Sequence, residues 1–382
     1  MTPSARLQAA IEILDQVIAA ARDAGPAADT ILQRYFASRR YAGSKDRRAV
    51  RDLVFAAIRS AGERPETGRA AIIAHARAHA PDLLALFGEG PHAPAALQPD
   101  EPEAPQGLAP AWLRAALAAR FGADVERQMT ALLARAPLDV RVNALKAKRD
   151  IVAAAHPDWQ ILARAAHGLR LPTGTQVEQL PEYLAGQIEV QDEGSQMAAE
   201  AVAAQPGEMV VDLCAGAGGK TLALAADMKV QGRLVACDTD RARLAQLGPR
   251  SVRAGAIGIE PRLLDPGREA SALADLAGQC DAVLIDAPCS GSGTWRRNPE
   301  SRWRLTPERL ARLTATQAQL IRLGASLLRP GGRLVYVVCS LLPDEGEAQL
   351  ASHEGLAPWN SRVLTPANDG CDGFFIAQTA RL

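Results

Sequence analysis

Apolar residues recur every three or four positions through the first part of the chain. This spacing is that of the buried face of an amphipathic helix. The helices that it predicts lie at residues 4–24, around 31–36 and around 53–58, with Ser44 as the N-cap of the third. We therefore expect residues 1–87 to form an all-helical domain.

Prolines and acidic residues then interrupt the pattern over residues 88–110, which predicts a linker or a loop that follows the surface. Helical spacing returns around 111–135, and Val140 to Asn143 has the composition of a short strand. Residues 111–190 are therefore expected to form a middle region of α+β character.

From about residue 206, short apolar runs alternate with helical stretches. The runs that predict strands lie at residues 209–212, 234–237, 282–285, 333–338 and 374–377, and the helices between them at 219–228, 240–253 and 306–328. Such alternation is typical of a parallel sheet covered by helices. We expect residues 191–382 to form an α/β domain with a mostly parallel sheet.

Composition narrows the class of protein. The 382 residues are 48% apolar and 23% charged, which is ordinary for a globular protein of two or three domains. No apolar run approaches the roughly 18 residues of a membrane helix, and the N-terminus lacks a secretory pattern, so we expect a cytoplasmic protein. The net charge is zero, so whole-chain charge gives no support for nucleic-acid binding. None of the six cysteines forms a CxxC pair, and no metal site is predicted.

The strand that ends at Asp212 leads into a glycine-rich turn, residues 214–221, and then a helix. Three classes of ligand use such a turn. A P-loop nucleotide is suggested by Gly219-Lys220-Thr221, but its first glycine would fall at Cys214. A dinucleotide is suggested by Gly216-Ala217-Gly218, but the third glycine of that motif would fall at Thr221.

The third class is S-adenosylmethionine, which is cationic and favours acidic neighbours. Asp212 precedes the loop, Asp238 ends the next strand where a ribose diol would lie, and Asp265 follows a third strand. Each could instead be an ordinary cap or turn residue. Three acids at strand ends of one sheet are less easily explained in that way.

Two cysteines follow strands of the same sheet. Cys289 lies in the turn Asp286-Ala287-Pro288-Cys289-Ser290-Gly291, and Cys339 follows the strand that ends at Val338. Ligand sites of open parallel sheets lie at this edge. A cysteine beside a methyl donor suits methylation of cytosine at carbon 5. A thiolate that adds to carbon 6 makes carbon 5 able to accept a methyl group, and Asp286 is placed to support the ring nitrogen N3 by a proton or a hydrogen bond.

These residues resemble the Sun (Fmu, NSUN-type) family of RNA cytosine-5 methyltransferases over roughly residues 137–382. The segments that carry the resemblance are Arg141–Asn143, Val190–Gln196, Cys214–Thr221, Asp286–Thr294, Arg296–Pro299, Cys339–Ser340 and Asp372–Phe375. The resemblance implies a Rossmann-like methyltransferase domain preceded by an all-α NusB-like RNA-binding domain. Two departures stand out: Gly216-Ala217 replaces the usual Ala-Pro, and Val338 replaces the usual Thr before Cys339.

The same resemblance implies roles for individual residues. It implies that Cys339 is the nucleophile, that Cys289 helps to release the product as the base or its relay, and that Lys220 and Asp286 lie at the catalytic centre. The residues that it implies for the S-adenosylmethionine pocket are Asp212, Cys214, Ala215, Gly216, Ala217, Gly218, Gly219, Lys220, Asp238, Asp265 and Asp286. Bacterial members with such an N-terminal domain act on small-subunit (16S) ribosomal RNA, so ribosomal RNA is the expected substrate and partner, and transfer RNA the alternative.

Two stretches suggest RNA contacts. Residues 34–59 contain eight Lys or Arg and only two acids. Such an excess of positive charge is typical of an RNA-docking face or of a solvated helix surface. Arginines at 296, 297, 302 and 304 alternate with Trp295 and Trp303, which could hold a flipped base or belong to the core. No membrane or protein partner is implied. Two rival functions remain: a P-loop ATPase, and a catalytically silent ribosome-assembly factor, for which Val338 is the only support.

Overall fold

The protein was analysed as a computed structural model, which describes residues 1–23, 25–350 and 354–382. The end of the first predicted helix, at residue 24, lies outside the described residues. The chain divides into two compact units, one of Met1–Arg135 with Thr294–Pro307 and one of Ala136–Gly293 with Glu308–Leu382. The domain boundaries expected from the sequence remain a prediction. Within the described ranges, no helix has the length and apolar character needed to cross a membrane.

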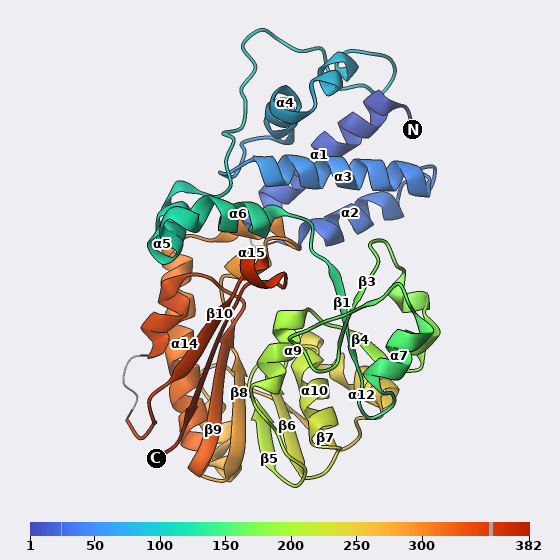
Figure 1. The fold of residues 1–382 in the computed structure, drawn as a ribbon. Coiled ribbons are helices and arrows are strands. Elements are labelled where there is room, and N and C mark those ends of the chain that lie inside the picture. The colour runs from blue at the N-terminus through green and yellow to red at the C-terminus, as the bar shows by residue number, and fades with distance from the viewer. Residues whose placement is uncertain (24, 351–353) are drawn as a thin grey trace. The chain divides into compact units, whose positions relative to one another are not determined.

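The first unit is helical, as the spacing of its apolar residues predicts. Its elements are α1 (Pro3–Arg22), α2 (Ala28–Ala37), α3 (Ser44–Ser60), α4 (Gly68–His79), α5 (Ala111–Phe121), α6 (Val125–Leu133) and the 3-10 turns η1 (Pro81–Leu86), η2 (Gly122–Asp124) and η6 (Pro299–Arg304) (Figure 1). Apolar side chains of α1 to α4 form one core cluster.

The N-cap predicted for α3 is wrong by one residue. Ser44 is the first helical residue, and Gly43 is the cap. The Asp46 carboxylate accepts a hydrogen bond from the Gly43 N–H at 3.2 Å. An acid in the first turn therefore satisfies the backbone donor of the cap residue, whereas a serine cap would have accepted from an N–H inside the first turn.

The proline-rich stretch lies against the helical unit over part of its length. The Ala104 N–H of this stretch donates a hydrogen bond to the Ala70 carbonyl of α4. Its Glu101 forms an ion pair with Arg69 of α4 at 2.6 Å. A short bridge joins Ala61 to Gln106. Of the two possibilities left open by its composition, these contacts favour a surface-following loop.

A segment from far along the chain completes the core of the helical unit. Trp303 is a member of its apolar cluster, and its indole N–H donates to the Ala61 carbonyl at 3.2 Å. Arg302 is fully buried and donates to the carbonyls of Ile58 (2.7 Å), Arg59 (3.2 Å) and Ala61 (2.8 Å). Burial lowers the pKa of Arg302 to about 9. Both side chains therefore have a structural role, and they are not placed to hold a base.

The second unit is built on a seven-stranded sheet with strand order β10-β11-β9-β8-β5-β6-β7 (Figure 1). Its strands are β5 (Met209–Asp212), β6 (Arg233–Asp238), β7 (Ile259–Leu263), β8 (Cys280–Asp286), β9 (Leu328–Val338), β10 (Asn360–Leu364) and β11 (Phe374–Ala380). Strands β7, β6, β5, β8 and β9 pair in parallel, and β10 and β11 are antiparallel. This confirms the predicted α/β fold with a mostly parallel sheet.

Helices cover both faces of this sheet. Alternate strand residues point to opposite sides, so Val210 and Leu284 pack in one cluster with residues of α9 (Glu193–Glu200), α10 (Gly219–Asp227) and α12 (Leu247–Ala254). Their neighbours Val211 and Val283 pack in a second cluster with residues of α14 (Pro307–Leu327). The near-continuous apolar strands predicted from the sequence follow from this double burial.

The predicted helix over residues 240–253 is divided into α11 (Arg241–Leu244) and α12. Pro249 explains the break, because a proline inside a continuous helix would remove a hydrogen bond and clash with the preceding turn. A restart at Leu247 places the proline in a first turn, where its missing N–H costs nothing.

The middle region contributes a separate four-stranded antiparallel sheet of order β2-β3-β1-β4. The strands are β1 (Leu138–Val142), β2 (Gln160–Ile161), β3 (Gly168–Leu171) and β4 (Ile188–Val190). Short helices α7 (Arg149–Ala155) and α8 (Pro181–Leu184) and the 3-10 turn η3 (Val177–Gln179) connect these strands. The remaining short elements of the second unit are α13 (Glu269–Ala272), α15 (Pro366–Asp369), η4 (Ala274–Leu276), η5 (Ser292–Thr294), η7 (Pro343–Glu345) and η8 (Glu347–Leu350).

We predict that Arg302→Ala destabilises the helical unit by more than about 3 kcal/mol, because several buried carbonyls lose a charged donor. Hydrogen exchange followed by mass spectrometry should show faster exchange in α3. Arg48→Ala, at an exposed position of the same helix, is the matched control and should exchange like the wild type. Unchanged protection in Arg302→Ala would contradict the structural role of this arginine.

Candidate active site

Parallel pairing places the predicted site residues at one edge of the large sheet. Asp212 ends β5, Asp238 ends β6, Asp286 ends β8, and Cys339 directly follows β9. Because these four strands run in the same direction, their carboxyl ends meet at the same edge. Hydrogen bonds and ion pairs then link most of the predicted residues.

The glycine-rich loop between β5 and α10 curls back on the strand ends. Gly216 and Gly218 have φ angles of +56° and +87°, in the left-handed region that favours glycine. The Gly216 N–H donates to Asp238 Oδ2 at 2.7 Å, and the Ala215 N–H donates to the Cys237 carbonyl at 2.8 Å. The loop therefore holds a fixed concave turn at the start of a helix.

Gly219 marks the open side of this loop. A Cβ built on Gly219 would meet no atom within 4 Å, whereas one on Gly218 would lie 2.3 Å from Leu247 Cδ1. The Asp238 carboxylate beside the loop also accepts from the Asp240 N–H at 2.7 Å. A small ligand can thus approach the backbone at Gly219 with an acidic side chain next to it.

Asp212 is fully buried and contacts the start of the same helix. Its Oδ2 accepts from the Thr221 hydroxyl at 2.7 Å. Burial raises the pKa of Asp212 to about 7, although the Thr221 hydrogen bond opposes the shift. Asp212 therefore holds the end of β5 against the start of α10.

Lys220 lies beside Asp286. Its ammonium group is 2.7 Å from Asp286 Oδ2, and it lies over the Phe374 ring, 5.6 Å from the centroid. Burial alone would lower the pKa of Lys220, but the Asp286 carboxylate outweighs it and the pKa is raised. The lysine is consequently a fixed cation, already bound by a carboxylate, which is not the arrangement of a P-loop lysine waiting for phosphate.

The two candidate cysteines are in contact. Cys289 Sγ and Cys339 Sγ lie 3.3 Å apart and share a hydrogen bond. That bond and burial raise the pKa of Cys289 well above its usual range, and a nearby carboxylate, Glu345, acts in the same direction. Lys220 interacts electrostatically with Cys339. The raised pKa of Cys289 favours its protonated form, and the cation that acts on its partner sulfur is Lys220.

The loops that carry these cysteines pack against the C-terminal strand region. The Gly293 N–H donates to the Cys339 carbonyl at 3.0 Å, and the Gly373 N–H donates to the Gly293 carbonyl at 2.8 Å. A Cβ on Gly293 would lie 2.0 Å from the Gly373 oxygen. Both glycines are thus required by a close approach of two backbones behind the site.

Two further residues predicted for the pocket, Asp265 and Cys214, lie in contrasting surroundings, one exposed and one partly buried. Asp265 is exposed just beyond β7, and its neighbour Leu264 donates from its N–H to the Asp238 carbonyl at 2.9 Å. Cys214 borders the loop among acids, and burial raises the pKa of its thiol. Cys214 is therefore suited to lining a pocket more than to acting as a nucleophile.

Sequence reasoning missed a polar cluster behind the two cysteines. It consists of Ser290, Ser292, Gln317, Ser340 and Glu345, which are joined by hydrogen bonds. The serines stand next to recognised motif positions, but no pattern distinguishes Glu345 from the acids on either side of it.

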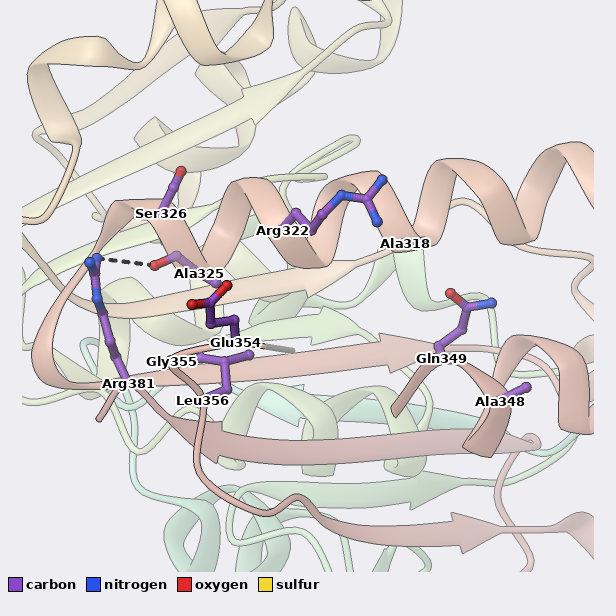
Figure 2. A pocket seen from close by; sticks show the side chains of 10 residues that line it. All are labelled: Ala318, Arg322, Ala325, Ser326, Ala348, Gln349, Glu354, Gly355, Leu356 and Arg381. Carbon is purple, nitrogen blue, oxygen red and sulfur yellow. Dashed lines mark hydrogen bonds between the residues drawn. The ribbon is translucent and has the colours of Figure 1, made fainter. Parts of the chain in front are cut away.

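A pocket of about 640 Å³ lies elsewhere, between α14 and the chain end (Figure 2). Its lining includes Arg322, Ser326 and Arg381, and Arg381 donates to the Ala325 carbonyl at 3.3 Å. None of the predicted site residues belongs to it. Among the residues with a described placement, no group of three or more His, Cys, Asp or Glu could hold a metal ion.

Comparison with known proteins agrees with this geometry. A family described as 16S rRNA methyltransferase RsmB/F matches residues 199–354. The ribosomal RNA small subunit methyltransferase B of Erwinia tasmaniensis is 33% identical, over 72% of this chain and 67% of the relative. The chain belongs to the RsmB/F family. This confirms the family resemblance carried by the sequence motifs.

Further RsmB/F relatives show the same extent of similarity. The probable ribosomal RNA small subunit methyltransferase B of Synechocystis sp. is 35% identical over 298 residues, which are 70% of this chain and 66% of the relative. The chain thus spans about two thirds of the length of the curated relatives it matches. A solved methyltransferase homologue from Pyrococcus horikoshii has a TM-score of 0.62 at 27% identity, covering 72% of this chain and 96% of that one.

The raised pKa of Asp212 predicts a pH-dependent effect of Asp212→Asn. An aspartate has a pKa near 3.9 when unfolded and about 7 here. Between these values the folded state holds a proton that the unfolded state has released, so stability falls as pH rises and the loss is complete above pH 7. The asparagine side chain of the variant does not titrate, so Asp212→Asn should gain stability relative to the wild type between pH 4 and pH 8.

Thermal unfolding of both proteins across this pH range measures the difference, which we expect to reach a few kcal/mol. Asp265→Asn, at an exposed position, should differ from the wild type by a constant amount. Parallel pH profiles for wild type and Asp212→Asn would show that burial does not perturb this carboxyl group.

Proposed function

We propose that this chain is an S-adenosylmethionine-dependent RNA (cytosine-5)-methyltransferase that acts on 16S ribosomal RNA. The observation that carries the proposal is the contact between the two cysteine sulfurs, 3.3 Å apart at the carboxyl edge of the sheet. Lys220 interacts electrostatically with Cys339, and Glu345 with Cys289. Family membership, the glycine-rich loop and its acids support the same conclusion.

The residues of the loop fit S-adenosylmethionine. The open space at Gly219 gives a ligand access to the backbone. Asp238 is placed at the end of β6, where a ribose would meet it, and the acids around the loop suit a cationic sulfonium better than a phosphate. When bound, the cofactor supplies an electrophilic methyl group.

Cys339 starts the reaction in this proposal. Its thiolate forms a bond with carbon 6 of cytosine, the double bond between carbons 5 and 6 opens, and its electron pair moves toward N3, which takes a proton from the solvent. The Asp286 carboxylate accepts a hydrogen bond from that N3–H and is itself held by Lys220. Carbon 5 is then nucleophilic enough to take the methyl group.

Cys289 acts in product release. After methylation, the proton on carbon 5 must leave before the bond between Cys339 and carbon 6 can break. Cys289 lies beside Cys339. It is either the relay for that proton, passing its own proton to the departing Cys339 sulfur as it accepts the new one, or the base, once it has given up its own proton. Loss of Cys289 should therefore leave attack possible and block release.

The helical unit supports RNA as the substrate. Exposed basic residues lie on α2, on α3 and between these helices, at Arg34, Arg40, Lys45, Arg47, Arg48 and Arg51. Arg51 also pairs with Asp29 at 3.1 Å, and Arg39 packs over the Tyr35 ring. The remaining cations suit a docking face for the phosphate backbone. Transfer RNA remains the alternative substrate.

A catalytically silent assembly factor is the alternative function, and its only sequence support was Val338. That side chain is fully buried in the cluster that contains Tyr336 and Phe375. Replacement of a usual threonine there changes the core behind the strand, so it gives the silent alternative little support.

We expect wild-type protein to transfer label from radioactive S-adenosylmethionine into 5-methylcytosine of 16S ribosomal RNA, taken from cells that lack the protein. Cys339→Ala should abolish the label, and Cys289→Ala should accumulate a covalent protein–RNA adduct. Cys280→Ala, at the opposite end of β8, is the matched control and should remain active. Label confined to transfer RNA would favour the alternative substrate, and cofactor binding without any label would favour the assembly factor.

Gly219→Ala tests the cofactor site separately. A methyl group there meets no protein atom, so folding should be unchanged, but it would occupy the space into which the ligand must come. We expect affinity for S-adenosylhomocysteine, measured by calorimetry, to fall about tenfold, equivalent to about 1.4 kcal/mol. Gly248→Ala adds a methyl group at an equally open position of α12 and should bind like the wild type. Equal affinities would place the ligand away from this loop.

A further inference from the structure

Glu345 lies directly behind the two cysteines, in the turn η7 that follows β9. Its side chain is fully buried. The carboxylate accepts hydrogen bonds from the Ser290 N–H (2.8 Å), the Ser290 hydroxyl, the Ser340 hydroxyl (2.5 Å) and the Gln317 amide (3.0 Å). Four donors to one buried group are what a charged carboxylate requires in such a place.

These donors come from the loops that carry the cysteines. Ser290 directly follows Cys289, and Ser340 directly follows Cys339. Gln317 of α14 is itself buried and also donates to the Pro288 carbonyl at 3.0 Å. A single carboxylate thus joins the two loops whose sulfurs touch.

Further bonds make this connection rigid. The Ser292 and Ser340 hydroxyls are 3.0 Å apart, and the Leu341 N–H donates to the Ser292 hydroxyl at 2.8 Å. The backbone of Glu345 is fixed as well, because the Tyr336 hydroxyl donates to its carbonyl at 2.7 Å. Tyr336 is fully buried in the sheet. The carboxylate therefore has little freedom to move away from the cysteine loops.

The charge of Glu345 is not neutralised by its neighbours. All of its hydrogen-bond donors are uncharged, and among the described residues no cation forms an ion pair with it. Its negative charge acts on the Cys289 thiol, while the cation of Lys220 acts on Cys339. The two charges thus act on different sulfurs of a pair that is in contact.

We propose that Glu345 is a positioning residue for methyl transfer: its buried carboxylate ties together the two loops that carry Cys289 and Cys339 and so holds the two sulfurs in the contact from which the reaction starts. The effect of Glu345 on catalysis rests on the proposed function. Its effect on the two thiols is a property of the protein alone and can be measured without RNA or cofactor.

The test is alkylation of the free protein by iodoacetamide between pH 6 and 9, with the modified peptides of Cys289 and Cys339 quantified by mass spectrometry. Thiolates react and thiols do not. In the wild type we expect Cys339 to react first. In Glu345→Gln, the preference for Cys339 over Cys289 should fall about tenfold, which corresponds to about one pKa unit at Cys289.

Asp344→Asn removes a negative charge at the adjacent, exposed position and should keep the wild-type preference. Ser340→Ala keeps the charge and removes one hydrogen bond, so it should change the preference in the same direction but less. If Glu345→Gln does not fold, as judged by near-ultraviolet circular dichroism, Ser340→Ala carries the test. A wild-type preference in the folded variant would overturn the proposal.

Methyl transfer gives the functional measurement. Glu345→Gln should lower kcat by about tenfold or more and leave the KM for S-adenosylmethionine unchanged, because it alters the cysteines and not the cofactor loop. An altered thiol preference with no methyl transfer even in the wild type would contradict the proposed function alone. Normal kcat together with an altered preference would overturn the positioning role.

Discussion

Parallel pairing of β5, β6, β8 and β9 is the constraint on which the site depends. Each strand contributes one functional side chain at its carboxyl end, and only a shared strand direction brings those ends together. The strands are buried on both faces, so their apolar residues fix the register, and a slip by one residue would turn each row of side chains to the wrong face. The chemistry is therefore positioned by the most buried part of the molecule.

Charge then distinguishes two cysteines that are otherwise equivalent. Both follow strands, both are partly buried, and their sulfurs are in contact. Lys220 acts on Cys339 and Glu345 on Cys289, and each is held in place, the lysine by Asp286 and the glutamate by serine and glutamine side chains. In a buried site such fixed charges act with little screening, so the two sulfurs differ in their electrostatic surroundings although they are in contact.

The sequence allowed the main elements to be predicted, because helices and buried strands leave periodic apolar patterns. Strands β5, β6, β8, β9 and β11 and helices α10 and α14 lie close to the predicted residues. Two predictions failed because a nearby residue has its own backbone preference. Pro249 divides a predicted helix, and Gly43 replaces Ser44 as a cap. Motif spacing brought out Asp212, Lys220, Asp286 and both cysteines as candidates, and the structure connects each of them to a neighbour in the site.

What could not be predicted depends on contacts between residues far apart in the chain. Nothing near Glu345 in the sequence shows that Ser290 and Gln317 will surround it, and nothing near Arg302 shows that it will bind carbonyls of α3. The close approach of Gly293 and Gly373 likewise joins residues far apart in the chain, and no local pattern predicts it.

Several motif residues that appear diagnostic prove to be structural. Asn143 donates from its amide to the carbonyls of Gly186 and Ala254, and Asp192 caps the start of α9 by accepting from the Gly194 N–H. Asn143 thus joins the end of β1 to α12, and Asp192 fixes the start of α9, so substitution at either position would disturb the scaffold. Motif residues of this kind identify the family through the scaffold, and the same scaffold fixes the position of the two sulfurs in contact.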